Sequence, residues 1–171
     1  MKNVAWDIVA WNEAAASVLT DYALLPPDQR NVLRLMFRDA SVRAAQADWE
    51  HTARFVLAVF RADIARAGTC PRAQGLIEEL SRQSPEFAAM WLDHDVRTYG
   101  EGTKFIRPAG AEPIALEYSS FAVDGQPGFG MVIYTPATPA DAAQVKSLIA
   151  RRRKRRALAS REESVSAVGA V

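Results

Sequence analysis

The sequence has little of what stabilises secreted or membrane proteins. Cys70 is the only cysteine among 171 residues, which excludes an internal disulfide and a cysteine-based zinc site. No apolar run approaches the ~20 residues needed to cross a bilayer, and the N-terminus has no basic region leading into an apolar stretch. We therefore expect a cytoplasmic protein with no membrane partner and no secretory signal.

The motifs of several enzyme classes are missing as well. The sequence contains no Gly-x-Ser-x-Gly, no His-Glu-x-x-His and no Walker loop, and the glycine-rich stretch 100–105 lacks a third glycine. Cys70 precedes a predicted helix, but no local signature supplies a partner base. His94 lies between Asp93 and Asp95, which falls short of a metal-ligand set. We predict no catalytic residue, no metal and no cofactor; an enzyme working through Cys70 or His94 is the minor alternative.

What is present is typical of one globular domain. Hydrophobic residues make up 49% of the chain and charged residues 24%, which excludes wholesale disorder. A chain of this length can bury a sizeable core. We expect one domain over residues 1–150 and a basic helix end and partly disordered tail over residues 151–171.

The charge is unevenly distributed along the chain. Residues 1–150 hold 14 Lys and Arg against 18 Asp and Glu, a net charge of −4, whereas residues 151–171 hold 7 against 2, a net charge of +5. The excess begins with a basic run of Arg151, Arg152, Arg153, Lys154, Arg155 and Arg156. A helix end running into a solvated tail is favoured, because cations suit the negative end of the helix dipole. The alternative is an interaction or nucleic-acid contact through this run, which lacks aromatic residues for stacking on bases.

Capping residues, prolines and β-branched residues divide the chain into elements. The predicted helices start after Asn12, at Pro27, after Asp48, at Pro71, at Pro85 and after Thr138. The predicted strands cover residues 4–11, 104–107, 114–123 and 130–135. One strand, several helices and then a three-stranded meander predict an α+β domain with an antiparallel sheet flanked by helices.

Several phrases at characteristic spacing carry a family resemblance. They are Val9-Ala10-Trp11-Asn12, Arg30 to Phe37 with Asp39, Asp48-Trp49-Glu50, Arg61, Ser84-Pro85-Glu86-Phe87, and Trp91 with His94-Asp95-Val96. In this order, over about residues 6–150, they resemble the C-terminal ligand-binding domain of MmyB-like regulators. These regulators are bacterial transcription factors of the XRE helix-turn-helix class.

The resemblance implies a PAS-like fold that encloses a mainly apolar pocket. Members of the family resemble sensors of fatty acids or similar small molecules, and they govern a DNA-binding domain on the same chain, commonly as dimers. We therefore expect a bound fatty-acid-like amphiphile, contact with DNA only through a helix-turn-helix module, and a homodimer.

The sequence departs from the family pattern in two places. Met1 lies only ten residues before Trp11, so the helix-turn-helix module and the first strand of the family are expected to lie outside this chain. Arg107 precedes Pro108 where relatives often have a histidine, which puts any role of that histidine in doubt.

A fatty-acid-like ligand needs apolar walls and a cationic or amide anchor for its carboxylate. The candidates for the walls are Phe37, Trp49, Phe87, Met90 and Trp91. For each of them, a place in the ordinary core is the alternative.

Three polar positions and one histidine are candidates for the anchor. Arg30 and Asn31 open an apolar helix, where they offer hydrogen-bond donors; the alternative is an Arg30–Asp28 pair and a local cap by Asn31. Arg61 follows on the long helix, with a structural ion pair as its alternative. His94 is a candidate for one further hydrogen bond to the ligand.

Overall fold

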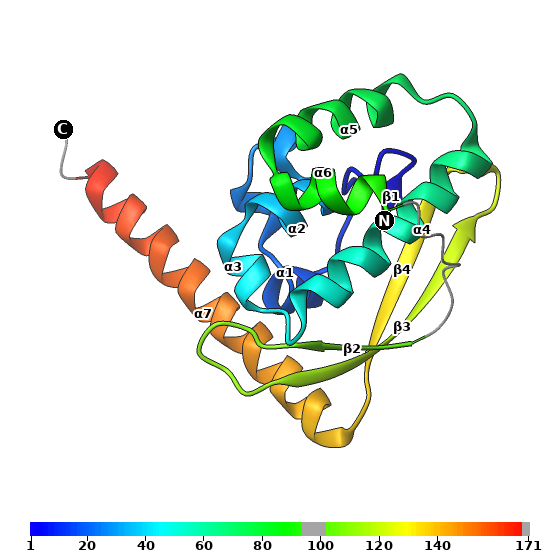
Figure 1. The fold of residues 1–171 in the computed structure, drawn as a ribbon. Helices are drawn as coiled ribbons and strands as arrows, with labels where there is room; N and C mark the ends of the chain where they lie inside the picture. Colours follow the sequence, from blue (N-terminus) through cyan, green and yellow to red (C-terminus); the bar gives the residue numbers. More distant parts are fainter. Residues whose placement is uncertain (94–101, 169–171) are drawn as a thin grey trace.

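The structure is a computed structural model that describes residues 1–93 and 102–168 of the chain (Figure 1). Its α-helices are α1 (Glu13–Val18), α2 (Val32–Arg38), α3 (Ala40–Ala44), α4 (Trp49–Ala67), α5 (Pro71–Gln83), α6 (Pro85–Leu92) and α7 (Pro139–Val168). The short 3₁₀ helices η1 (Tyr22–Leu24) and η2 (Pro27–Gln29) lie between α1 and α2. Its strands are β1 (Lys2–Asn3), β2 (Gly102–Ile106), β3 (Ile114–Val123) and β4 (Gln126–Pro136).

Capping residues and prolines set the starts of most helices. The side chains of Asn12, Asp48 and Ser84 accept hydrogen bonds from backbone N–H groups in the first turns of α1, α4 and α6. Pro71 and Pro85 open α5 and α6, where the missing N–H of proline would have no helical partner. These predicted starts are confirmed.

Two predicted elements near the N-terminus are wrong. The expected strand 4–11 does not form, because Trp6 adopts a positive φ of 63° and turns the chain back on itself. The helix expected to open at Pro27 is interrupted, since Pro27 opens only η2. The helix α2 begins after Asn31, whose side-chain oxygen accepts from the N–H of Leu33 at 2.9 Å.

The strands form one antiparallel sheet in the order β1-β4-β3-β2. Strand β2 is an edge strand that pairs with β3, from Gly102 opposite Tyr118 to Ile106 opposite Ile114. Beyond the edge, the backbone N–H of Arg107 donates to the carbonyl of Ala45 at 2.8 Å. The predicted α+β class, with an antiparallel sheet flanked by helices in a single domain, is confirmed.

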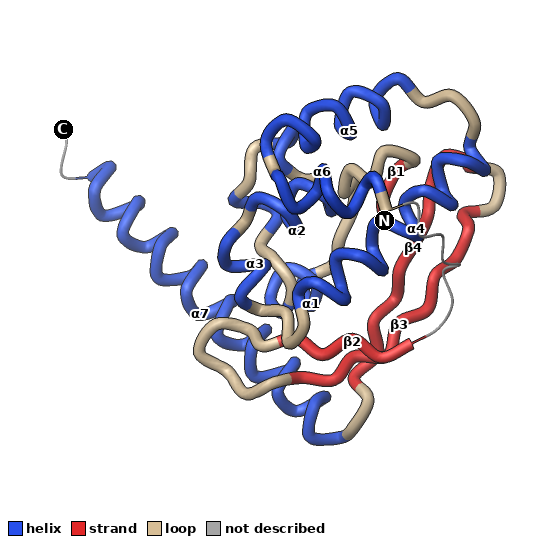
Figure 2. The backbone as a smooth tube through the Cα atoms, in the orientation of Figure 1, coloured by secondary structure: helices blue, strands red, loops and turns tan. Residues whose placement is uncertain are grey.

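The helices cover one face of this sheet, as the ribbon path in Figure 2 shows. On the covered face, Ile106, Ile114 and Leu116 pack in one buried cluster with Val18 of α1 and Leu148 of α7. Helix α4 crosses the same face further along. Residues of the covered face therefore pack against α1, α4 and α7.

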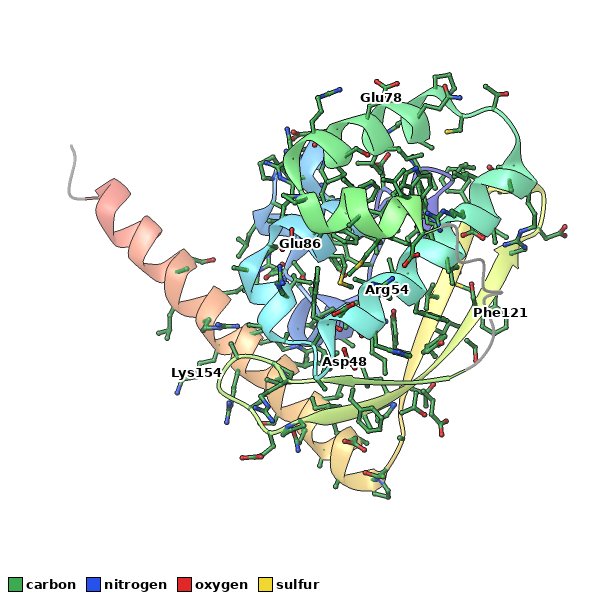
Figure 3. All side chains as sticks on the ribbon, viewed as in Figure 1. Asp48, Arg54, Glu78, Glu86, Phe121 and Lys154 are labelled. Atoms are coloured by element: carbon green, nitrogen blue, oxygen red, sulfur yellow. The ribbon has the colours of Figure 1, made fainter. Side chains whose placement is uncertain are left out.

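The opposite face of the sheet is open. The apolar side chains of Phe105, Phe121, Met131 and Ile133 are 58%, 47%, 36% and 45% exposed. Figure 3 shows Phe121 on the side of the sheet away from α2 and α3. The alternation between exposed and covered positions is what an antiparallel sheet with one covered face requires.

Helix α7 packs on α1 and then extends away from the rest of the protein (Figure 1). Arg152 is 6% exposed, and its Nε and Nη2 atoms each donate to Asp21 at 2.8 Å. The helix continues through the basic run to Val168, and residues 169–171 lie outside the described residues.

Candidate ligand-binding site

The aromatic residues expected to line a pocket come together in one cluster. Phe37 of α2 lies 5.7 Å from Trp49 and 5.1 Å from Phe87, measured between ring centroids. Phe87 stacks on Trp91 of α6 at 5.8 Å, and Trp91 lies 6.2 Å from Phe60 of α4. Three helices therefore supply one continuous aromatic cluster.

Much of this aromatic cluster is tightly packed core. Phe60 and Phe87 have no exposed surface, and Phe37 is only 9% exposed. Trp49 and Trp91 are partly buried at its edges, and the Trp49 indole N–H donates to the Met36 carbonyl at 2.9 Å. Any contact with a ligand would therefore come from the edges of the cluster.

Arg61 lies against the same cluster. Its guanidinium lies 4.4 Å from the centre of the Trp91 ring, a cation–π geometry. Its Nη2 atom donates to the carbonyls of Trp91 and of Met90, the latter at 3.3 Å. Arg61 thus binds backbone carbonyls at the C-terminal end of α6, where a cation is favoured.

Arg30 and Asn31 have their partners elsewhere. The Arg30 Nε atom donates to the Leu25 carbonyl at 3.0 Å. Asn31 is completely buried and donates to the Ala5 carbonyl at 2.8 Å and to Asp7 at 2.9 Å, while its side-chain oxygen caps α2. These bonds join α2 to the N-terminal segment, the capping role given above as the alternative.

The chain also contains two histidines and a single cysteine. His94 lies outside the described residues, so its predicted contribution stays a prediction. His51 is exposed on α4. Cys70 is partly buried and packs against the main core.

A group that the sequence reasoning missed lies on the covered face of the sheet. Lys104 sits opposite Leu116, which is 3% exposed, and two residues before the buried Ile106. Tyr118 lies next along β3, opposite Tyr134 of β4, with their ring centroids 6.4 Å apart. The signal that could have found Lys104 is strand alternation, because it has the same parity as Ile106.

Helix α4 packs against these strand residues on the covered face. Phe55 of α4 lies 6.2 Å from Tyr118 between ring centroids. Gly102 leaves room for the Tyr118 ring, because a Cβ atom there would lie 2.7 Å from the phenol oxygen. We define the covered-face site as Lys104, Leu116, Tyr118, Tyr134 and Phe55.

Burial controls the charge of the covered-face site. Burial lowers the pKa of Lys104 from 10.5 to about 8. Burial also raises the pKa of Tyr134 to about 12 and raises that of Tyr118. At neutral pH the site therefore combines one ammonium group with two neutral phenols, a set that suits an anionic or polar head group.

Two surface recesses among the described residues lie apart from this site. One, between the N-terminal segment and α5, is lined by Ala5, Asp7, Arg34, Pro71, Arg72, Gly75 and Leu76. In that recess Asp7 pairs with Arg72. The other lies beside α7 and is lined by Gly110, Ala111, Glu112, Gln144, Ser147, Leu148 and Arg151. Neither lining includes a predicted ligand-binding residue.

Half of the basic run holds α7 to the domain. Arg152 pairs with Asp21, as described above, and Arg153 pairs with Glu13 at 2.5 Å. Arg151 donates to the carbonyl of Gly110 at 3.2 Å. Lys154, Arg155 and Arg156 are exposed, and Figure 3 shows Lys154 near the middle of α7.

These features define an α+β domain with apolar and phenolic side chains between one sheet face and its helices. No helix among residues 1–93 and 102–168 is both long and apolar enough to cross a membrane. The chain belongs to the MmyB-like transcription regulator ligand binding domain family, whose model matches residues 2–148. A search of the curated proteins finds no match. The family assignment makes this chain a ligand-binding domain of a transcription regulator.

Proposed function

We propose that this chain is a non-catalytic sensor domain whose ligand is a fatty acid or a similar amphiphile. The observation that carries the proposal is the match of residues 2–148 to a family of regulator ligand-binding domains. The covered-face site supports it, since Phe55, Leu116, Tyr118 and Tyr134 are apolar or phenolic and Lys104 is the one ammonium group among its five residues. An amphiphile needs such a combination of apolar surface and few polar groups.

The ligand is proposed to lie between α4 and the sheet, in contact with the covered-face site. Phe55 and Leu116 offer apolar surface there, and Tyr118 and Tyr134 offer hydroxyl groups. The Arg61 end of α4 adjoins the aromatic cluster through Trp91. One helix therefore borders both the covered-face site and the aromatic residues expected from the sequence.

The proposed output is control of a helix-turn-helix DNA-binding module, in the cytoplasm and as a homodimer. A ligand can shift DNA affinity only if it binds two states of the regulator with different affinities. A site bordered by both a helix and the sheet suits this role, because any change in the spacing between these elements changes the contacts with the ligand.

The proposal is tested by looking for a bound amphiphile and by adding one. Native mass spectrometry of the purified protein, before and after organic extraction, should reveal a removable small molecule. Thermal unfolding of the extracted protein should shift upward with dodecanoic acid, since a ligand at 100 times its Kd adds about 2.7 kcal/mol of stability.

Two phenylalanine variants test whether the shift in thermal unfolding comes from binding at the covered-face site. Phe55→Ala should reduce the shift caused by dodecanoic acid, because Phe55 faces Tyr118 on the covered face. Phe105→Ala removes the same ring from the open face, where it is 58% exposed, and should leave the shift unchanged. Absence of both a co-purified molecule and a shift with dodecanoic acid or 1-dodecanol would contradict the proposed function.

A further inference from the structure

Two lysines of this protein lie on the covered side of the sheet, and they differ in their partners. Lys2 of β1 is 8% exposed, and its Nζ atom lies 2.8 Å from Asp63 of α4 and 3.3 Å from the centre of the Trp6 ring. Lys104 of β2 is partly buried on the same face. Within the described part of the chain, Lys104 has no hydrogen bond, ion pair or ring partner.

This difference points to a missing anion. Moving an ammonium group out of water is unfavourable unless an opposite charge compensates for it. At Lys2 the fold supplies that charge from its own Asp63. At Lys104 the described residues supply none, and burial accordingly lowers the pKa of Lys104 to about 8.

A second polar atom near the same strand also lacks a partner. Gln46 forms an isolated bridge with Ile106, two residues beyond Lys104. Its Nε2 atom donates to the Val42 carbonyl at 3.1 Å, whereas its Oε1 atom is buried with no hydrogen bond from any described residue. An amide oxygen accepts hydrogen bonds, so of these two groups only the Lys104 ammonium can bind an anion.

We propose that Lys104 is the anchor for the anionic head group of the ligand, the head group being a carboxylate. This inference rests on the function proposed above and assigns a role to a residue that sequence reasoning did not select. Leu116 offers apolar contact beside the ammonium group, and the phenols of Tyr118 and Tyr134 lie next along the sheet. A carboxylate with an alkyl chain matches this combination of one cation and apolar surface.

The test compares two ligands that differ only in the head group. Dodecanoic acid and 1-dodecanol are titrated into the extracted full chain at pH 7, and both dissociation constants are measured by calorimetry. The variants are Lys104→Met and, as a matched control, Lys146→Met, which removes an exposed lysine of α7. The wild type should bind the acid about tenfold or more tightly than the alcohol, the usual contribution of a hydrogen bond to a charged group.

In Lys104→Met that preference should fall to near unity while binding of 1-dodecanol is unchanged, and Lys146→Met should behave as the wild type. A preference that survives in Lys104→Met would overturn the inference. Equal binding of acid and alcohol by the wild type would also overturn it but leave the proposed function intact. Binding of neither ligand would remove both.

A further variant and a direct measurement guard against a variant that fails to fold. Lys104→Arg retains the charge and should retain the preference for the acid. The chain has only four lysines, so their ¹³C-dimethylated amines give a simple NMR spectrum. Dodecanoic acid should shift the Lys104 resonance and leave that of Lys146 in place; a Lys104 resonance insensitive to saturating acid would contradict the inference.

Discussion

At the scale of single residues, Lys2 and Lys104 show how one chemical group serves two purposes. Lys2 joins β1 to α4 through Asp63, and the ammonium of Lys2 in turn lowers the pKa of that carboxyl group. Lys104 has no such partner among the described residues, so its charge makes the ligand-free fold less stable. A residue that lowers stability in this way is commonly retained for function.

The stability of Lys104→Met should therefore exceed that of the wild type, by an amount that depends on pH. The pKa of Lys104 is about 8 in the folded protein against 10.5 in the unfolded chain. Below pH 8 both states carry the charge and the destabilisation is complete, on the order of 2 kcal/mol. Between pH 8 and 10.5 the unfolded state binds more protons, so wild-type stability rises with pH and the advantage of the variant disappears.

Urea unfolding of ligand-free protein at pH 7 and pH 10 measures this difference. Among the described residues, the ionisable groups beside Lys104 on the covered face of the sheet are Tyr118 and Tyr134, and both are common to the two proteins. Lys2 also has a pKa of about 8, but it is present in both proteins, so its effect on stability cancels in the comparison. If the free energy of unfolding of Lys104→Met at pH 7 is equal to or lower than that of the wild type, the charge of Lys104 does not destabilise the fold.

Sequence reasoning was only partly able to identify site residues. The spacing of Phe37, Phe87 and Trp91 predicted large apolar side chains on inner helix faces, and the structure brings them together. The spacing could not separate core from pocket, because both require the same residue types. Lys104 was missed because alternation within a short strand shows which residues share a face, whereas tertiary packing decides which face the helices cover.

At the scale of elements, local chemistry predicted most helices and tertiary contacts decided the exceptions. Asn12, Asp48 and Ser84 cap helices as expected, because a cap depends on neighbours within a few residues. The predicted strand 4–11 is wrong, because Trp6 has a positive φ that turns the chain; its buried ring packs 5.5 Å from Phe60 of α4. No local pattern encodes a contact across that distance in sequence.

The attachment of α7 to the domain should depend on Arg152 rather than on the basic run as a whole. Arg152 pairs with Asp21 through two hydrogen bonds and is 6% exposed. Arg152→Ala leaves the Asp21 carboxylate without its partner, and we expect a loss of about 2 kcal/mol in the free energy of unfolding. Guanidinium unfolding followed by circular dichroism measures the loss.

The matched control for Arg152 is Arg155→Ala, one helical turn further along α7. Arg155 is exposed, so its replacement should change the free energy of unfolding by less than about 0.5 kcal/mol. Trypsin should cleave the native wild type after Arg155 or Arg156 before it cleaves after Arg152. Equal losses in the two variants would mean that the Asp21 pair contributes no more than an exposed arginine.

At the scale of the whole molecule, the protein consists of a helical layer and a sheet with separate cores. The larger core joins α2, α4, α5 and α6 with the N-terminal segment, and the smaller one lies under the sheet against α1 and α7. The order of helices and strands predicted the α+β class. It could not predict the strand order or the open face, because both depend on how the sheet meets the helices.

The proposed site lies where these two layers meet. Helix α4 contributes Phe55, and β2 and β3 contribute Lys104 and Tyr118. Strand β2 is an edge strand, and the contacts of its free side with the described residues are the Gln46 bridge and the hydrogen bond from Arg107 to the Ala45 carbonyl. An edge strand with so few bonds opens more readily than the centre of the sheet. A ligand held by Lys104 and α4 would therefore stabilise β2 against this opening.

Hydrogen exchange should report this coupling directly. Openings that break the site become rarer by the factor 1 + [L]/Kd, so dodecanoic acid at ten times its Kd should slow exchange in residues 102–107 about tenfold. Residues 71–83 of α5 lie in the helical layer away from the sheet and should exchange as before, except where they exchange only by global unfolding. In Lys104→Met the same concentration of acid should slow exchange in residues 102–107 very little. Equal slowing in both segments would mean that the ligand stabilises the domain as a whole, whereas no slowing in 102–107 would place the ligand away from β2.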